Sequence, residues 1–259
     1  MPVTPPLFTI LDSVGSTNNY AMAKVHAGLA KHGNAYYCAI QTEGKGQRGK
    51  NWHTGNGQNI ALSIIIQPAQ LLVRQQFILS ALVALACYEF FEAYAGDETK
   101  IKWPNDIYWN DRKAGGILIE NVIGSVKQEN TDIYQNVNTI WKYAIVGIGI
   151  NINQILFDKE LLNVVSLKHI TGKDYDVIDL AKALHIKVLN MLDKLSANSF
   201  EEILFLYNQH LYKKDCLVKL KKGNIVFETR IKSVSEKGEL CTIDAVERFF
   251  NFGEVQWVL

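Results

Sequence analysis

The first group of residues suited to chemistry is a glycine-rich basic loop at residues 44–52, in which glycines alternate with Lys45, Arg48 and Lys50. Glycines let backbone N–H groups approach an anion, and the cations balance its charge, so the loop suits a phosphate or a carboxylate. Its G-x-G-x-x-G spacing also occurs in dinucleotide-binding folds, but residues 50–57 cannot form the helix that this reading requires. No His-Arg-Asp catalytic loop supports a kinase. A solvated basic turn is the alternative.

The second group is the segment Lys-Trp-Pro-Asn-Asp at residues 102–106, followed by Lys113 directly before Gly115 and Gly116. A carboxylate such as Asp106 commonly holds Mg²⁺ beside a polyphosphate. A lysine such as Lys113 neutralises charge as an acyl phosphate forms. A β-hairpin with a surface lysine explains this segment equally well when it is taken alone.

The third group lies in an apolar segment at residues 147–153, which alternates glycine with isoleucine and ends in asparagines. Glycine inside a strand often marks close backbone approach, and Asn151 at the strand end could bond a ligand. A core strand with a polar terminus is the commoner explanation.

Together with Ser16-Thr17-Asn18 and Gln41, these segments resemble the biotin protein ligases in order and spacing along nearly the whole chain. The resemblance implies that ATP and biotin condense to biotinyl-5′-AMP, whose acyl group a carrier lysine then takes. It implies the activity of a biotin--[acetyl-CoA-carboxylase] ligase, with ATP and biotin as substrates and Mg²⁺ as cofactor. The implied partner is the biotin carboxyl carrier protein of acetyl-CoA carboxylase.

The resemblance also assigns roles position by position. It implies that Lys113 and Arg48 are catalytic and that Asp106 binds the metal. The implied biotin-binding residues are Ser16, Thr17, Asn18, Gln41, Gly44, Lys45, Trp52, Lys113, Gly115 and Gly116. The implied ATP-binding residues are Gln47, Arg48, Lys50, Trp52, Asn105, Asp106 and Asn151.

The glycine-rich loop departs from the commonest family pattern, because Lys45, Gln47 and Lys50 stand where that pattern has arginines. Lysine does not reproduce the bidentate geometry of arginine. Gln47 is the larger change, because the family's arginine there helps to organise and retain the adenylate. We hypothesise that Arg48 compensates for it.

Three other functions compete with this interpretation. A lipoate ligase shares the fold and the adenylate chemistry. A non-catalytic biotin-sensing module would not explain Lys113, and a plain nucleotide-binding α/β protein would not explain the Ser16-Thr17-Asn18 and Gln41 matches.

Periodicity predicts strands at residues 7–11, 36–42, 59–67, 101–103, 107–109, 116–123 and 142–153, and helices at 18–30, 73–95, 177–195 and 200–211. The helix at 73–95 is apolar almost all round and should be buried. Only strands follow residue 212, which indicates a small all-β barrel appended to an α/β core. The resemblance refines this to an α+β fold: a mixed-sheet catalytic core flanked by helices, similar to class II synthetases, at 1–211, and an SH3-like barrel at 212–259.

The bulk properties add expectations about location and partners. Lys+Arg is 27 and Asp+Glu is 26, so no global field favours nucleic acid or a membrane surface. The four cysteines form no C-x-x-C pair, so we expect reduced thiols. No signal peptide is visible, and the apolar stretch 77–91 is too short to span a bilayer. We therefore expect a cytoplasmic location. The catalytic pattern begins within the first dozen residues, so we expect no helix-turn-helix domain and no DNA binding. The resembling family also allows a homodimer.

Overall fold

The computed structural model describes residues 7–52, 54–127, 137–158, 161, 163–196 and 199–258. A seven-stranded sheet has the order β1-β2-β3-β7-β6-β5-β4. Its strands are β1 (Phe8–Val14), β2 (Ala35–Gln41), β3 (Asn59–Ile66), β4 (Thr99–Lys102), β5 (Asp106–Trp109), β6 (Arg112–Lys127) and β7 (Val137–Asn151). Because β1 and β2 are parallel and the other neighbours antiparallel, the predicted mixed sheet is confirmed.

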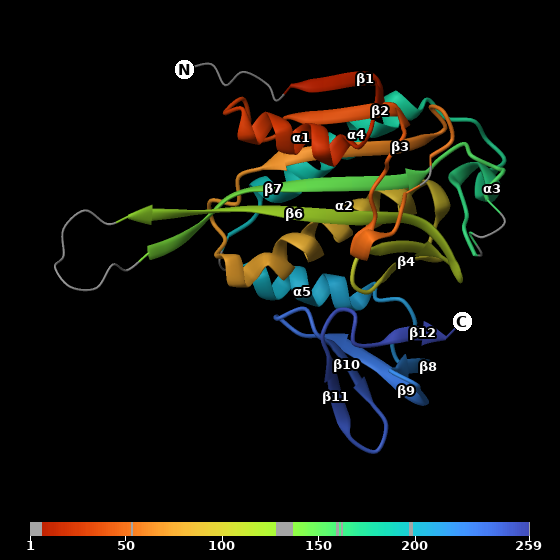
Figure 1. Cartoon of the computed structure of the whole chain (residues 1–259). Coiled ribbons are helices and arrows are strands. Elements are labelled where there is room, and N and C mark those ends of the chain that lie inside the picture. The colour runs from red at the N-terminus through yellow and green to blue at the C-terminus, as the bar shows by residue number, and fades with distance from the viewer. Residues whose placement is uncertain are drawn as a thin grey trace.

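Helices cover both faces of this sheet (Figure 1). They are α1 (Thr17–His26), α2 (Gln76–Ala95), α3 (Leu167–Thr171), α4 (Val177–Asp193) and α5 (Phe200–Gln209), with short 3₁₀ turns at Gln47–Gly49 and Val73–Gln75. The alternation along β3 shows why: Ile64 and Ile66 face the large core cluster, whereas Ile65 joins a smaller cluster with Ala21 of α1. A strand that is buried on both faces reads as a continuous apolar run, as β3 does.

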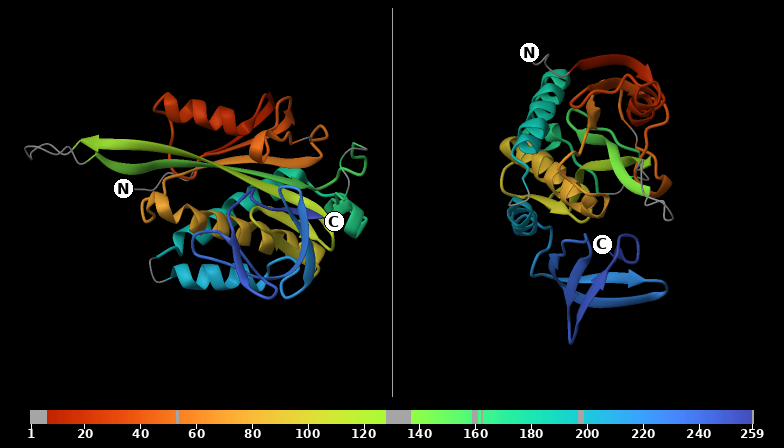
Figure 2. Two further views of the ribbon diagram at one scale, coloured as in Figure 1. Left: turned by 60° about the horizontal axis from the view of Figure 1, so that its bottom comes forward. Right: turned by 90° about the vertical axis from the view of Figure 1, so that its left-hand side faces the viewer.

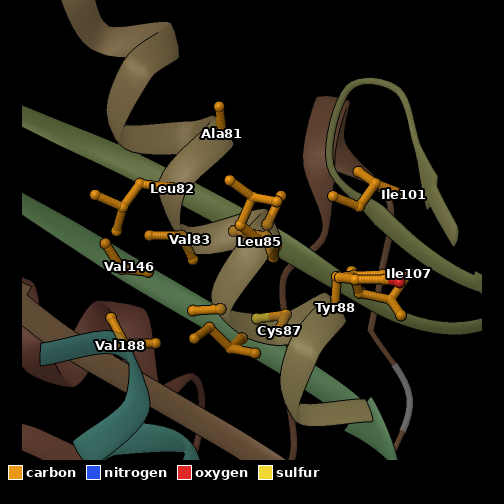
Figure 3. Packing of buried hydrophobic residues seen from close by; sticks show 14 of the residues in the cluster. Ala81, Leu82, Val83, Leu85, Cys87, Tyr88, Ile101, Ile107, Val146 and Val188 are labelled. Carbon is orange, nitrogen blue, oxygen red and sulfur yellow. The ribbon is translucent and has the colours of Figure 1, made fainter. Parts of the chain in front are cut away.

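The predicted buried helix is α2, which lies between the sheet, α4 and α5. Figure 3 shows its side chains, among them Leu82 and Val83, packed toward Val146 of β7 and Val188 of α4. By length and composition the segment Val73–Ala95 would also qualify as a membrane span, so the expectation that the apolar stretch was too short is corrected. Its most apolar window is 72% buried within the structure, and a core position explains its composition.

The chain after α5 forms a five-stranded antiparallel sheet with the order β11-β10-β9-β8-β12, which lies beside α5 (Figures 1 and 2). Its strands are β8 (Leu217–Lys222), β9 (Ile225–Val234), β10 (Leu240–Ile243), β11 (Glu247–Phe250) and β12 (Gln256–Val258). Along β8 only Val218 and Leu220 are buried, and both belong to the large core cluster. This arrangement is consistent with the predicted small barrel; its boundary at residue 212 remains a prediction.

Several element boundaries differ from the prediction. The strand predicted at 116–123 continues as β6 to Lys127, and the strand predicted at 142–153 begins as β7 at Val137; residues 128–136 lie outside the described part. The two strands run as a long antiparallel pair beyond the rest of the sheet (Figure 2). The helix α1 ends at His26 rather than at residue 30, and α3 was not predicted. Ser166 caps α3 by accepting a hydrogen bond from the His169 backbone N–H at 3.2 Å.

Candidate active site

A hollow at the middle of the seven-stranded sheet gathers most of the predicted site residues. It encloses about 470 Å³, its open mouth included. Its walls are formed by the start of α1, the end of β2, the start of β5, the glycine-rich loop, the first half of β6, and residues 61–62 of β3 and 147–149 of β7. The predicted residues that line it are Ser16, Thr17, Asn18, Gln41, Lys45, Gln47, Trp52, Asn105, Asp106, Lys113 and Gly116.

The polar floor, as it is called here, consists of the lining residues Ser16, Thr17, Asn18 and Gln41 together with Ser63, which is buried behind Thr17 and Asn18. The Oε1 atom of Gln41 accepts hydrogen bonds from the Thr17 backbone N–H at 2.8 Å and from Thr17 Oγ1 at 3.0 Å. The Ser63 hydroxyl lies 2.8 Å from Thr17 Oγ1 and 2.6 Å from Asn18 Oδ1. These bonds fix the orientation of every member except Ser16 before any ligand arrives.

Two polar groups of the floor make no hydrogen bond within the described residues: Ser16 Oγ and Gln41 Nε2. Ser16 is the N-cap residue of α1 by position, but its side chain makes no capping bond. Gln41 Nε2 is left without an acceptor because Oε1 holds Thr17. The floor therefore offers a hydroxyl and an amide donor to a small neutral polar ligand.

Asn18 lines the hollow, and its predicted biotin-binding role remains a prediction. Its Nδ2 donates a hydrogen bond to Glu120 Oε2 at 2.8 Å, and its Oδ1 accepts one from the Ser63 hydroxyl. Both ends of the amide are thus engaged by protein, so Asn18 braces α1 against β3 and β6. Ser63 and Glu120 were not predicted, although each interrupts an otherwise apolar strand. That interruption is the signal that would have pointed to them.

Close backbone approach explains the glycines of β7. A Cβ on Gly147 would lie 2.3 Å from Asn18 Oδ1, and one on Gly149 would lie 2.3 Å from Trp52 Cε2. The indole of Trp52 therefore lies against the strand where only glycine leaves room. Its Nε1 is buried without a hydrogen-bond partner among the described residues, so it is a further donor beside the hollow.

The outer part of the site, here called the cationic mouth, consists of Lys45, Arg48, Lys50 and Lys113. Lys113 Nζ lies 2.7 Å from Asp106 Oδ1, in a pair that is only partly exposed. Lys113 therefore points toward the hollow, where a Cβ on Gly116 would lie 3.3 Å from its Nζ. A cation held there can meet a developing negative charge.

The glycine-rich loop carries the remaining cations of the mouth. Backbone bonds from Gly46 N to Lys50 O (2.7 Å) and from Trp52 N to Gly44 O (2.8 Å) close it as a tight hairpin. Lys45 Nζ donates to Asn19 Oδ1 at 2.6 Å. Arg48 and Lys50 do not line the hollow.

Arg48 points instead toward the C-terminal sheet. It adopts a left-handed backbone conformation with φ 57°. Its guanidinium donates to Gly253 O at 3.4 Å and lies 5.7 Å from the centre of the Phe252 ring. A cation seated there must move to reach a phosphate in the hollow.

Three other predicted residues lie outside the hollow. Gly44 and Gly115 support it, because a Cβ on Gly44 would lie 2.3 Å from Trp52 O and one on Gly115 would lie 2.8 Å from Gly149 O. Asn151 is buried, and its Nδ2 donates to Val165 O at 3.1 Å. Asn151 thus ties β7 to the segment before α3, and its predicted nucleotide-binding role remains a prediction.

The donor set does not form a protein-built metal site. Among the described residues, no three His, Cys, Asp or Glu side chains lie together in a group that could hold a metal ion. Asp106, the predicted ligand, already holds the ammonium group of Lys113. Mg²⁺ bound by one carboxylate needs phosphate and water ligands besides, so no step below depends on a metal.

Lys102 is a buried cation outside the cationic mouth, and only 7% of its surface is exposed. Its Nζ donates to Tyr108 Oη at 3.0 Å and lies 5.7 Å from the centre of the Tyr212 ring and 5.2 Å from that of Trp257. Burial lowers the pKa of Lys102 to about 8, and Asp106 opposes that shift. This lysine joins β4 to the C-terminal sheet and does not line the hollow.

Comparisons with known proteins agree with this architecture. The Bifunctional ligase/repressor BirA of Bacillus spizizenii is 35% identical over 150 residues, which cover 57% of this chain and 42% of that protein. The Biotin--[acetyl-CoA-carboxylase] ligase of Mycobacterium tuberculosis is 27% identical over 56% of this chain and 49% of its own length. The alignments thus span less than half of these relatives.

Solved structures match over nearly the whole chain. The biotin protein ligase from Aquifex aeolicus in complex with biotin and ATP has a TM-score of 0.76 and 24% identity, covering 96% of this chain and 97% of its own. The Leishmania major enzyme in complex with biotinyl-5-AMP has a TM-score of 0.63 and 21% identity. These structures establish the fold. The model of the "Biotin/lipoate A/B protein ligase family" matches residues 10–138, just under half of the chain.

Proposed function

We propose that this protein is an ATP-dependent biotin–protein ligase, which forms biotinyl-5′-AMP and transfers biotin to a lysine of a carboxyl carrier protein. One observation carries the proposal: the free donors of the polar floor and the ammonium of Lys113 line the same hollow. A ligand with a neutral polar head at one end and a carboxylate at the other fits that distribution. Biotin has both, in its ureido ring and its valerate.

The polar floor favours biotin over lipoate. The ureido ring has a carbonyl oxygen that can accept from Gln41 Nε2 or Ser16 Oγ, whereas a dithiolane ring has no comparable acceptor. A site built to hydrogen-bond a ligand rejects an analogue that leaves its polar groups unpaired. Asn18 and Ser63 would act through Thr17 and Gln41, by holding the floor in place.

The chemistry requires positioning and charge stabilisation. The biotin carboxylate attacks the α-phosphorus of ATP, pyrophosphate leaves with the electrons of the broken P–O bond, and a mixed anhydride remains. Lys113 would stabilise the negative charge that gathers on the α-phosphate oxygens. Trp52 would cover the acyl–phosphate junction, with its free Nε1 as a donor. The lysine amine then attacks the carbonyl carbon, and AMP leaves.

The proposal extends to the surroundings of the enzyme. The four cysteines are unpaired, which fits the reducing cytoplasm. The carrier of acetyl-CoA carboxylase is the proposed acceptor, Arg48 and Lys50 the proposed phosphate contacts, and a homodimer remains a prediction.

A labelling assay tests the function. The protein is incubated with ATP, a biotin carboxyl carrier domain, and either biotin or lipoate, and the carrier mass is measured. We expect a biotin adduct with the wild type and almost none with Lys113→Ala. A lipoate adduct instead of a biotin adduct would establish the lipoate alternative, and no pyrophosphate release with either acid would exclude a ligase.

A further inference from the structure

A second opening lies next to the hollow, and the proposed function does not account for it. This side cleft encloses about 1050 Å³, its open mouth included. Its walls come from both sheets: α2, the β4–β5 turn and β6 on one side, and the β9–β10 and β11–β12 turns on the other. The lining residues on which the argument depends are Gln47, Ser80, Asn105, Ile117, Asn121 and Lys237.

The side cleft and the hollow share a wall. Gln47, Asn105 and Ile117 line both. The wall is held by one carbonyl, because Ile117 O accepts from Asn105 Nδ2 at 2.7 Å and from Gln47 Nε2 at 3.4 Å. The Gln47 side chain is thus a thin partition between the two spaces. A group that enters the side cleft arrives beside the hollow without passing through the cationic mouth.

Among the described residues that line the side cleft, the buried polar atoms without a hydrogen-bond partner are oxygens. Gln47 Oε1 is buried and has no partner, and the same holds for Asn121 Oδ1. The assignment at Gln47 is determined, because a carbonyl can only accept and the amide nitrogen must therefore face Ile117 O. Unpaired buried acceptors favour a ligand that donates hydrogen bonds.

The charges point the same way. None of the described residues that line the side cleft carries a carboxylate, and Lys237 is its one cationic lining residue. An ammonium group that enters is not held by a counter-charge, and a like charge nearby disfavours its protonated form. Neutral amine is the form that attacks an acyl carbon. A polyphosphate would instead face the unpaired oxygens of Gln47 and Asn121.

We propose that the side cleft admits the side chain of the acceptor lysine, which donates to Gln47 Oε1 and reaches the acyl carbon across the Gln47 partition. This inference rests on the proposed function. The lysine nitrogen forms a bond to the carbonyl carbon, the bond from that carbon to the phosphate oxygen breaks, and AMP leaves with its electrons. The surplus amine proton passes to the departing phosphate. The C-terminal sheet thus builds one wall of the acceptor route.

Two variants narrow the side cleft from two elements of the same wall: Ser80→Trp on α2 and Asn121→Trp on β6. Ala93→Trp, at an exposed position near the other end of α2, is the matched control. The full-length protein is assayed in two half-reactions. Biotin-dependent pyrophosphate release reports adenylate formation, and single-turnover transfer from preformed biotinyl-adenylate to a biotin carboxyl carrier domain reports the second step. Circular dichroism shows whether each variant is folded.

We expect both filling variants to slow transfer about tenfold or more while pyrophosphate release stays at the wild-type rate, because the amine loses its approach to the acyl carbon. The control should transfer normally. Transfer at the wild-type rate in a folded filling variant would overturn the route. An equal loss of rate in both half-reactions would also overturn the route, and would indicate that the side cleft binds ATP. If Ser80→Trp does not fold, Asn121→Trp decides. Failure of the wild type to form any adenylate would instead refute the proposed function.

Discussion

The two ends of the hollow are built on different principles. In the polar floor, Thr17, Asn18, Gln41 and Ser63 bond to one another and are rigid before a ligand arrives. In the cationic mouth, three of the cations bond to separate groups outside their own set. Lys45 lies on Asn19, Arg48 on Gly253 and Lys113 on Asp106.

Electrostatics explains the difference. Neutral dipoles attract one another when they are aligned, so a network of amides and hydroxyls is stable when it is empty. Like charges repel in a site of reduced dielectric, so clustered cations need other partners until an anion arrives. The comparison teaches that recognition of the neutral head is preorganised, whereas the charge-stabilising end must exchange partners during the reaction. Four substitutions test this, from the largest expected effect to the smallest.

The largest effect is expected for Lys113→Ala, which removes one of the two cations among the described residues that line the hollow. We expect biotin-dependent pyrophosphate release to fall about 10²–10³-fold at saturating substrates, because the charge on the α-phosphate is no longer met. Stopped assays of pyrophosphate at several biotin concentrations measure this. Lys168→Ala, which breaks an exposed ion pair with Asp174, is the control. If the substitution only raised the KM for biotin and left the turnover rate unchanged, Lys113 would act in biotin recognition like the polar floor, and the difference between the two ends of the hollow would be refuted.

The floor is tested by Gln41→Leu, which removes both its support of Thr17 and its free amide donor. The dissociation constant for biotin should rise about 10–100-fold, the usual cost of an unmade buried hydrogen bond. The turnover rate at saturating biotin should change little. Isothermal titration calorimetry gives the constant, with Gln67→Leu at an exposed position as control. A lower turnover rate with unchanged biotin affinity would contradict the view that the polar floor acts only in biotin recognition.

The fold could be predicted largely because local patterns carry it. The strand β3 is a continuous apolar run bounded by polar residues, and α2 is apolar all round, so both are evident in the sequence. The five C-terminal strands follow from alternation and turns. α3, with five residues, is too short for periodicity to register. The polar composition of residues 124–139 shows no apolar alternation, so the sequence did not indicate the strand ends there.

The site residues could be predicted from the sequence only where a family motif identified them. The gathering of Ser16, Gln41, Lys113 and other matched residues in one hollow agrees with the resemblance. Which of them contact a ligand could not be predicted, because hydrogen-bond partners depend on distant segments. Asn18 is engaged by Glu120, which lies 102 positions away. The seat of Arg48 on Gly253 likewise depends on the C-terminal sheet, 205 positions along the chain.

Asp106→Asn sharpens the comparison by removing the charge on which Lys113 rests while keeping the shape of the side chain. Adenylate formation should fall about three- to tenfold, because the pair is partly exposed and its contribution is correspondingly modest. The Mg²⁺ concentration for half-maximal rate should stay unchanged if Asp106 acts only by holding Lys113. A Mg²⁺ titration of pyrophosphate release measures both. A marked rise in that concentration would show that Asp106 is a metal ligand and that the mouth holds its cation by other means.

The smallest effect is expected for Arg48→Ala. If Arg48 compensates for Gln47, it must leave Gly253 and Phe252 to hold the adenylate phosphate, and its loss should speed adenylate release about three- to fivefold through one missing charge-assisted contact. Release of labelled biotinyl-5′-AMP through a desalting column measures the rate. Arg48→Lys should fall between wild type and Arg48→Ala, and Arg74→Ala on the exposed turn before α2 is the control. Indistinguishable rates for wild type and Arg48→Ala would refute compensation. Arg48 would then only tie the loop to the C-terminal sheet, and the exchange of partners would be confined to Lys45 and Lys113.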